Sequence, residues 1–155
     1  MKKILYTIWQ CTWGILQTLL GLIMFMFMLY FKSRHFVYHG AIITEWNTKS
    51  SISRGLFVFV TSEPYFAKKY EGQLNVSECS SRLLVHEYGH TIQSLILGPL
   101  YLIVIGIPST LWGFFGAKKR KDKQVAYGSF FTEGWENSLG EWVTGEKSIG
   151  NMVLD

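Results

Sequence analysis

The chain begins with an apolar run that restricts the classes of fold open to it. Residues 4–31, ILYTIWQCTWGILQTLLGLIMFMFMLYF, hold no charged side chain over 28 positions. A helix that spans a bilayer needs about 20 apolar residues, whereas the apolar core of a cleaved signal peptide has about 7–15. The next residues, KSRH, form no small-residue cleavage pattern. We therefore predict a retained transmembrane anchor over residues 1–31 and a membrane-associated domain over residues 32–155.

The composition favours a membrane protein as well. Hydrophobic residues make up 48% of the chain and charged residues only 17%, against about 25% in average globular proteins. The net charge of +4 is concentrated in KKRKDK, residues 118–123. Because such clusters are common beside apolar segments, we expect membrane lipid as a partner and no nucleic acid, with the domain over residues 32–155 in the cytoplasm. Cys11 and Cys79 fit no CxxC pattern and are expected to be free thiols.

A second apolar run, residues 94–116, is uncharged over 23 positions and long enough to cross a bilayer. It is interrupted at LGP and again at Pro108, and proline removes a helical hydrogen bond and clashes with the preceding turn. The pieces of about eight residues on either side reach only about 12 Å each. We therefore predict a broken hairpin, re-entrant or interfacial, that leaves residues 32–93 and 117–155 on the same side.

Between the two runs the sequence predicts a small β-hairpin followed by a long helix. Residues 37–46 and 55–61 are rich in β-branched and aromatic side chains, which indicates two antiparallel strands. The helix begins after Asn75, where Glu78 completes a capping box, and stops at a Gly-Pro dipeptide. A shorter helix is expected over residues 129–142. With the anchor, these elements make a mainly α membrane protein.

The long helix carries HEYGH, which has the H-E-x-x-H spacing of zinc proteases. His86 and His90 lie one turn apart on one face, so both can point a ring nitrogen at one Zn²⁺. Glu87 is rotated by about 100° from His86, so it can reach a water at the metal without binding the metal. We assign His86 and His90 as metal ligands, Glu87 as the catalytic base and Gln93 as a supporting residue.

The motif leaves the third protein ligand of a catalytic zinc site unassigned. No histidine follows the motif, and His35 and His39, which precede it, are expected at the surface or the membrane interface. The candidates are therefore the acidic residues of the C-terminal part: Asp122, Glu133, Glu136, Glu141 and Glu146. Glu133 and Glu136 are one turn apart on a predicted helix, so both could face inward.

HEYGH with a glutamate on a downstream helix resembles the gluzincin-type metallopeptidases, whose third ligand comes from an E-x-x-A/D motif. HEYGHTIQSLILGPLYLIVIGIPS and TEGWENSLG also resemble small uncharacterised bacterial membrane proteins and tail segments of some RHS-repeat proteins, in which the second motif tends to read T-E-x-W-A-N. The resemblance, over about residues 83–140, implies Glu133 as the third ligand. Trp135 and Asn137 match the aromatic and the asparagine of that motif. Glu136 stands where a small residue is usual, so it is an alternative ligand.

These features predict a membrane-anchored zinc metallopeptidase, an endopeptidase with Glu87 as general base and membrane-proximal polypeptides as substrates. The alternative is a non-catalytic membrane module, such as an immunity or assembly factor, whose motif is structural or a relic. A closed four-ligand site would favour the module, and an open position beside Glu87 would favour the enzyme. Metal transport is less well supported, because one site and one span make no pathway.

Overall fold

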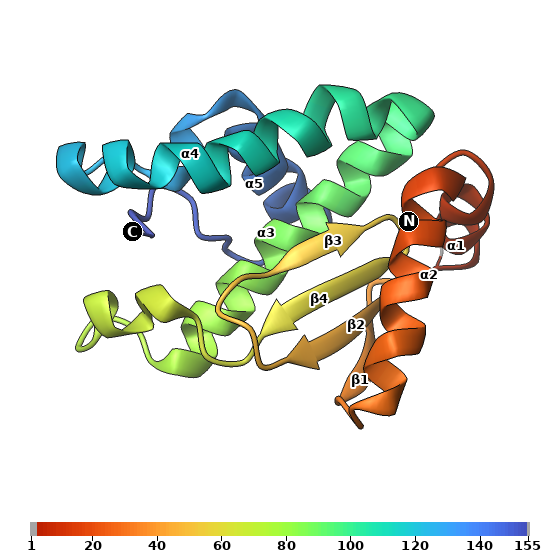
Figure 1. Ribbon diagram of the computed structural model, residues 1–155, viewed down its shortest axis with the longest axis horizontal. Coiled ribbons are helices and arrows are strands. Elements are labelled where there is room, and N and C mark those ends of the chain that lie inside the picture. The colour runs from red at the N-terminus through yellow and green to blue at the C-terminus, as the bar shows by residue number, and fades with distance from the viewer. Residues whose placement is uncertain (1–2, 155) are drawn as a thin grey trace.

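A four-stranded sheet and the helices around it make up the computed structural model, which describes residues 3–154 (Figure 1). Residues 1–2 of the predicted anchor and residue 155 of the predicted domain lie outside the described residues. The helices are α1 (Lys3–Thr12), α2 (Ile15–Tyr30), α3 (Val76–Leu97), α4 (Ile107–Lys123) and α5 (Phe131–Thr144). The strands are β1 (His35–Tyr38), β2 (Ala41–Trp46), β3 (Ile52–Arg54) and β4 (Phe57–Thr61). The prediction of a mainly helical chain with a small sheet is confirmed.

The sheet has the strand order β1-β2-β4-β3, with β2 and β4 parallel. The predicted antiparallel pairing of residues 37–46 with 55–61 is therefore wrong. His39 and Gly40, with φ values of 48° and 101°, form a two-residue turn that splits the first predicted strand into the antiparallel pair β1 and β2. Gly55, with φ of 60°, begins a second tight turn, which makes β3 the antiparallel partner of β4, while β2 pairs with β4 in parallel. Strand β3 lies between the two predicted strands, in residues 47–54, for which no strand was predicted.

The first apolar run forms two helices, α1 and α2, and not one. The break lies at Trp13–Gly14, between the end of α1 and the start of α2. Two polar side chains of the run, Gln10 and Gln17, are fully buried against α3. Gln10 Nε2 donates to the Thr91 carbonyl at 2.8 Å, and Gln17 Nε2 donates to Ser94 Oγ at 2.6 Å. The run is therefore attached to the helix that carries the motif.

Membrane-spanning helices are the part of the prediction that the structure does not support. Among residues 3–154, no single helix combines the length and the apolar composition of a span. Two bent pairs satisfy both conditions only when taken together. They are α1 with α2, bent by 99°, and the segments Val76–Leu100 and Leu102–Lys123, bent by 120°.

The second apolar run reverses direction at Gly98–Leu100, a short 3-10 turn directly after α3. A π-helical stretch, Leu102–Gly106, then continues into α4. The prediction that the chain is divided at Pro108 is wrong. Pro108 lies in the first turn of α4, directly after the π-helical stretch, and the helical turns continue through it, since proline is tolerated in the first turn of an α-helix. Gly98, at a φ of 52°, makes the turn instead.

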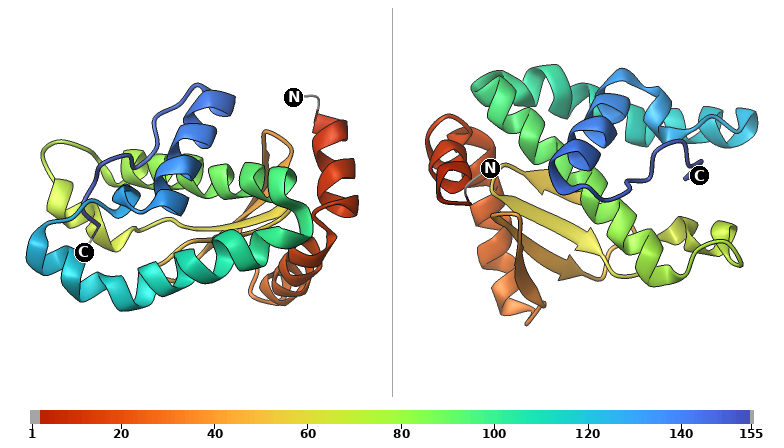
Figure 2. Two further views of the ribbon diagram at one scale, coloured as in Figure 1. Left: turned by 90° about the horizontal axis from the view of Figure 1, so that it is seen from above. Right: turned by 180° about the vertical axis from the view of Figure 1, so that it is seen from behind.

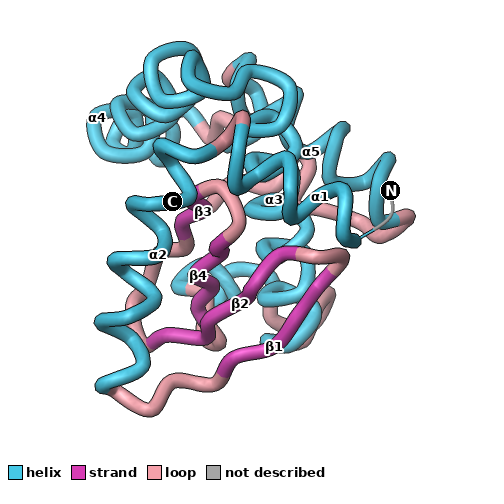
Figure 3. The backbone as a smooth tube through the Cα atoms, turned by 90° about the vertical axis from the view of Figure 1, so that its right-hand side faces the viewer, coloured by secondary structure: helices cyan, strands magenta, loops and turns pink. Residues whose placement is uncertain are grey.

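The motif helix α3 lies between the sheet and α5 (Figure 2). Its side towards the sheet joins a core of buried apolar residues from β2, β4 and α3 that includes Ile43, Phe59 and Tyr88. Helix α2 runs beside the end of the sheet at which β3 finishes and β4 begins (Figure 3). Phe25 of α2 packs there against Phe57, with ring centroids 5.1 Å apart. The side of α3 that faces α5 is left for polar groups.

Candidate metal centre

The N-terminal end of α3 is built as the sequence predicts. Asn75 accepts a hydrogen bond from the Glu78 amide at 2.8 Å, and the Glu78 carboxylate accepts one from the Asn75 amide at 2.8 Å. This capping box starts a helix of 22 residues, so the HEYGH segment lies in its second half. His86, Glu87 and His90 are all buried.

Helices α3 and α5 cross with their backbones in direct contact. A Cβ atom added at Gly89 would lie 2.1 Å from the carbonyl oxygen of Glu136, and one added at Gly140 would lie 2.4 Å from that of Val85. Atoms cannot approach so closely, so only glycine fits at these two positions. The contact at Gly89 falls between the two histidines in sequence. It therefore brings the carboxylates of α5 next to the imidazoles of α3.

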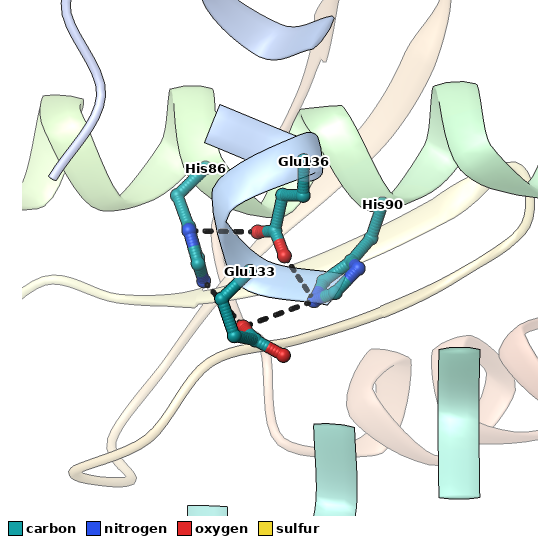
Figure 4. Close-up of side chains that lie close together, drawn as sticks. All are labelled: His86, His90, Glu133 and Glu136. Carbon is teal, nitrogen blue, oxygen red and sulfur yellow. Dashed lines mark ion pairs between the residues drawn. The ribbon is translucent and has the colours of Figure 1, made fainter. Parts of the chain in front are cut away.

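Four buried side chains meet at this crossing: His86, His90, Glu133 and Glu136 (Figure 4). One potential ligand atom from each lies within 4.8 Å of the others. Glu136 Oε1 is 2.8 Å from His86 Nδ1, and Glu136 Oε2 is 2.6 Å from His90 Nε2. Glu133 Oε2 is farther away, at 3.5 Å from His86 Nε2 and 3.8 Å from His90 Nε2.

These distances fit a metal ion held between the two Nε2 atoms and Glu133. Ligand atoms around a tetrahedral zinc ion, with bonds of about 2.0–2.1 Å, lie about 3.3 Å apart, which is close to the Glu133 separations. Glu133 Oε2 and both carboxylate oxygens of Glu136 are buried and have no hydrogen-bond partner. Buried oxygens of this kind are costly unless a cation or a donor satisfies them. The donor set of two imidazoles and two carboxylates could therefore hold a metal ion.

Neighbouring amide groups contact Nδ1 of both histidines, which leaves each Nε2 facing the carboxylates of the cluster. His86 Nδ1 lies 3.1 Å from Asn137 Oδ1, and His90 Nδ1 lies 2.7 Å from Gln93 Oε1. Since an amide oxygen can only accept, both Nδ1 atoms carry the proton in these contacts. Hydrogen-bonded Nδ1 atoms of this kind are usual behind metal-binding histidines. Asn137 and Gln93, the two residues predicted to support the site, each contact one histidine of the cluster.

A short chain of hydrogen bonds also joins His90 to Glu133. Gln93, which contacts His90, donates from Nε2 to the Thr132 carbonyl at 2.8 Å. The Thr132 hydroxyl donates to Glu133 Oε1 at 2.8 Å. Glu133 is therefore held in place by the protein even without a metal. Thr132 was not expected at the site, and its small polar side chain carries no signal that would have identified it.

Burial sets the charge state of the centre. It lowers the pKa of His86 to about 4, against the influence of Glu133, so the imidazole is neutral near pH 7 and able to bind a cation. Burial raises the pKa of Glu133, but His90 and His86 lower it by more, so it lies below its ordinary value. Burial, Glu133 and Glu87 together hold the pKa of Glu136 well above its ordinary value. A cation at this position would relieve the crowding of negative charge.

A cavity of about 410 Å³ opens onto the centre. His86, Glu87 and His90 line its inner side. Its other walls include Ser53 and Arg54 of β3, Tyr101 before α4, Thr110 and Phe114 of α4, and Tyr127 after α4. A larger, open groove lies between residues 47–49 and 61–76 and contains none of the four clustered side chains. The cavity of about 410 Å³ is therefore the one that reaches the clustered side chains.

The remaining candidates from the sequence lie elsewhere. Glu141 accepts hydrogen bonds from the amide and the hydroxyl of Ser148, and Glu146 accepts one from the Tyr38 hydroxyl at 3.1 Å. Asp122 is an exposed residue of α4. His35 contacts Thr44 at 3.0 Å, and His39 lies in the turn between β1 and β2. None of these belongs to the metal cluster among the described residues.

Sequence reasoning missed the residues of the cavity wall. Arg54, Tyr101 and Tyr127 reach the cavity from three segments that are distant in sequence. Tyr101 and Tyr127 lie outside any motif, and Arg54 lies in a stretch for which no strand was predicted. They come together because β3 packs against α3 and because the chain turns back after α3 into α4, which contacts α5. Gly55 was the one local signal in the sequence, because a glycine between two short segments can mark the tight turn that follows β3.

No protein-family model matches this chain, and no curated protein and no solved structure matches it either.

Proposed function

We propose that this protein is a zinc metallopeptidase of gluzincin type that cleaves polypeptides at a membrane. The observation that carries the proposal is the meeting of His86, His90 and Glu133 in one buried cluster. His86, His90 and the neighbouring Glu87 also line a cavity. A zinc ion held by His86, His90 and Glu133 would act as a Lewis acid towards water and a peptide carbonyl. The protein's own contribution is to bind the ion, to orient its ligands and to move the proton.

Glu87 is suited to move that proton. It follows His86 on α3, lines the cavity and is not among the four clustered ligands. Its Oε2 atom is buried and has no hydrogen-bond partner, so it is free to accept a proton from the attacking water and to pass it to the leaving amine nitrogen. Burial raises the pKa of Glu87 to about 8 in the metal-free protein. A cation bound by the histidines would lower this pKa and so favour the carboxylate form, which accepts the proton.

An extended polypeptide fits the edge of the sheet. Strand β3 is the last in the order β1-β2-β4-β3, so among the described residues its outer edge pairs with no strand. Ser53 and Arg54 of β3 line the cavity beside Glu87. Peptides commonly add to such an edge through main-chain hydrogen bonds, which would lay the scissile bond across the centre.

Lipid contact is supported by the outer surfaces of α1, α2 and α4. Large apolar side chains on these helices are more than half exposed: Ile4, Ile8, Ile23, Phe27, Phe114 and Phe115. Apolar surface on this scale is unusual on a monomeric soluble protein and marks a protein or membrane contact. We propose that these helices hold the protein at the cell membrane, with the catalytic part in the cytoplasm.

A non-catalytic metal-binding module is the second candidate, and Glu136 is the observation that favours it. With Glu136 the cluster offers four protein ligands, as closed structural zinc sites do. Such a module could serve as an immunity or assembly factor at the membrane.

Metal analysis combined with a turnover assay distinguishes the two candidates. In the enzyme, Glu87→Gln keeps zinc and loses proteolysis of a membrane-proximal polypeptide by at least a hundredfold, whereas His90→Ala loses the zinc itself. Glu63→Gln, the same change at an exposed position, is the control and should alter neither quantity. Unchanged metal content in His90→Ala, or undiminished proteolysis in Glu87→Gln, would rule out the proposed enzyme.

A further inference from the structure

Glu136 contacts the metal-binding histidines more closely than Glu133 does. Its two oxygens lie 2.8 Å and 2.6 Å from nitrogens of His86 and His90, and its side chain is fully buried (Figure 4). A small residue at this position would leave room beside the ion for a water. In this chain a carboxylate takes up that room.

The position of Glu136 is built into the helix crossing. A Cβ at Gly89 would meet the carbonyl oxygen of Glu136 at 2.1 Å and its Cγ at 2.9 Å. Any other residue at 89 would therefore push Glu136 away from the histidines. Gly89 therefore leaves the space that allows the Glu136 carboxylate to lie beside the two histidines.

The two glutamates differ in what holds them. Glu133 accepts a hydrogen bond from Thr132, which is linked through Gln93 to His90. Neither oxygen of Glu136 has a hydrogen-bond partner. When a cation binds, Glu133 is therefore the ligand that the protein fixes. Among the described residues, Glu136 has ion-pair contacts with the two histidines of the cluster but no hydrogen bond like the one from Thr132, so it is the ligand that can leave.

We infer that Glu136 is an internal fourth ligand that closes the metal centre at rest and is displaced when the centre is used. This inference rests on the proposed function, because it assumes that the cluster binds a metal ion. Catalytic zinc sites usually keep the fourth position for water or substrate. An incoming oxygen or nitrogen donor must here exchange with the Glu136 carboxylate, so the resting protein should bind outside ligands weakly. Four protein ligands in this cluster are then compatible with an enzyme that is inactive at rest, and they do not by themselves indicate a structural zinc site.

The test uses the full-length protein in detergent, loaded with Co²⁺ in place of zinc, and follows the visible absorption of the ion. The probe is imidazole, a neutral donor, so that loss of the Glu136 charge does not by itself favour its binding. We expect Glu136→Ala to keep Co²⁺ and to bind imidazole at least tenfold more tightly than the wild type. Glu141→Ala, on the same helix but outside the cluster, should behave as the wild type does. Glu133→Ala should lose Co²⁺.

Equal imidazole affinity in the wild type and Glu136→Ala would overturn the inference and leave the proposed function standing. Loss of Co²⁺ from a folded Glu136→Ala would also overturn it, because Glu136 would then be an obligatory ligand. If Glu136→Ala does not fold, Glu136→Gln, which keeps the shape of the side chain, is judged by the same criteria. A wild-type protein that binds neither Co²⁺ nor Zn²⁺ would reject the proposed function, and the inference with it.

Discussion

Gly89 shows how one residue without a side chain can set the geometry of a polar cluster. It lies between the two histidines of the motif and touches the backbone of α5 at Glu136. Glycine at this position destabilises α3 by about 1 kcal/mol relative to alanine, but it allows the two helices to approach closely. The carboxylates could not reach the imidazoles if the helices were farther apart.

We expect Gly89→Ala to destabilise the protein by about 1–3 kcal/mol, because the new methyl group forces α5 away from α3. Metal affinity should fall with it. Thermal unfolding and a chelator titration measure the two effects. Gly106→Ala is the control, since a Cβ there meets no atom closer than 3.7 Å. A Gly89→Ala protein as stable as the control would contradict the close crossing.

Glu87 makes the stability of the metal-free protein depend on pH. Burial raises its pKa from 4.5 to about 8, so between these values the folded protein keeps a proton that the unfolded chain releases. Its stabilising contribution is therefore lost as the pH rises through this window. Glu87→Gln cannot lose the proton, so at about pH 9 it should exceed the wild type in stability by more than about 1 kcal/mol.

The difference in stability between Glu87→Gln and the wild type should become smaller towards about pH 5, where the wild-type Glu87 carboxyl is largely protonated in the folded protein. Thermal unfolding of both metal-free proteins across the pH range measures it. Exposed Glu63→Gln should show no such difference. A difference between Glu87→Gln and the wild type that does not change with pH would mean that Glu87 is not buried as the structure has it.

At the scale of elements, buried amides attach the N-terminal helices to α3. Gln17 donates to Ser94 Oγ and, at 3.1 Å, to the Gly98 carbonyl at the end of that helix. Ser94 Oγ in turn donates to Gln10 Oε1 at 3.0 Å. These contacts lie within two turns of His90. The orientation of α1 and α2 therefore helps to fix the end of the helix that carries the ligands.

Replacing Gln17 by leucine should cost about 1–3 kcal/mol, because Ser94 and the Gly98 carbonyl lose a buried partner. Hydrogen exchange should rise at the amides of residues 91–98. Gln73→Leu makes the same change at an exposed site and should leave both quantities unchanged. Slow exchange that persists in Gln17→Leu would show that apolar packing alone holds the helices together.

At the scale of the whole molecule, the metal cluster restricts how the chain can lie at a membrane. Residues from α3 and α5 meet in one centre, although the second apolar run separates them in sequence. The reversal at Gly98–Leu100 makes this possible, because the chain turns back by 120° into α4, which contacts α5. The segments before and after the run must therefore share one side of any bilayer that holds the protein.

Cysteine labelling in membrane vesicles tests this arrangement. Ser50→Cys and Lys119→Cys, each in a background without Cys11 and Cys79, should react alike with an impermeant maleimide, because both positions are exposed and lie on the same side. Labelling of the two positions from opposite sides would exclude the shared centre.

Local interactions explain which parts of the fold could be predicted. The Asn75 cap, the Gly98 stop and the one-turn spacing of the two histidines each depend on residues within about four positions of one another. Such patterns are fixed by backbone geometry, so they can be read without the rest of the chain. The capping box and the extent of α3 are confirmed for this reason.

Long-range packing explains the remainder. The sequence by itself determined the helix that carries His86, Glu87 and His90, and it limited the carboxylate ligands to a few acidic residues. Only the tertiary structure decided that β4 pairs with β2 in parallel, that the first apolar run bends at Gly14, and that Glu133 and Glu136 both reach the imidazoles. These outcomes depend on contacts such as Gly89 with Glu136, between residues distant in sequence, and no local pattern records such contacts.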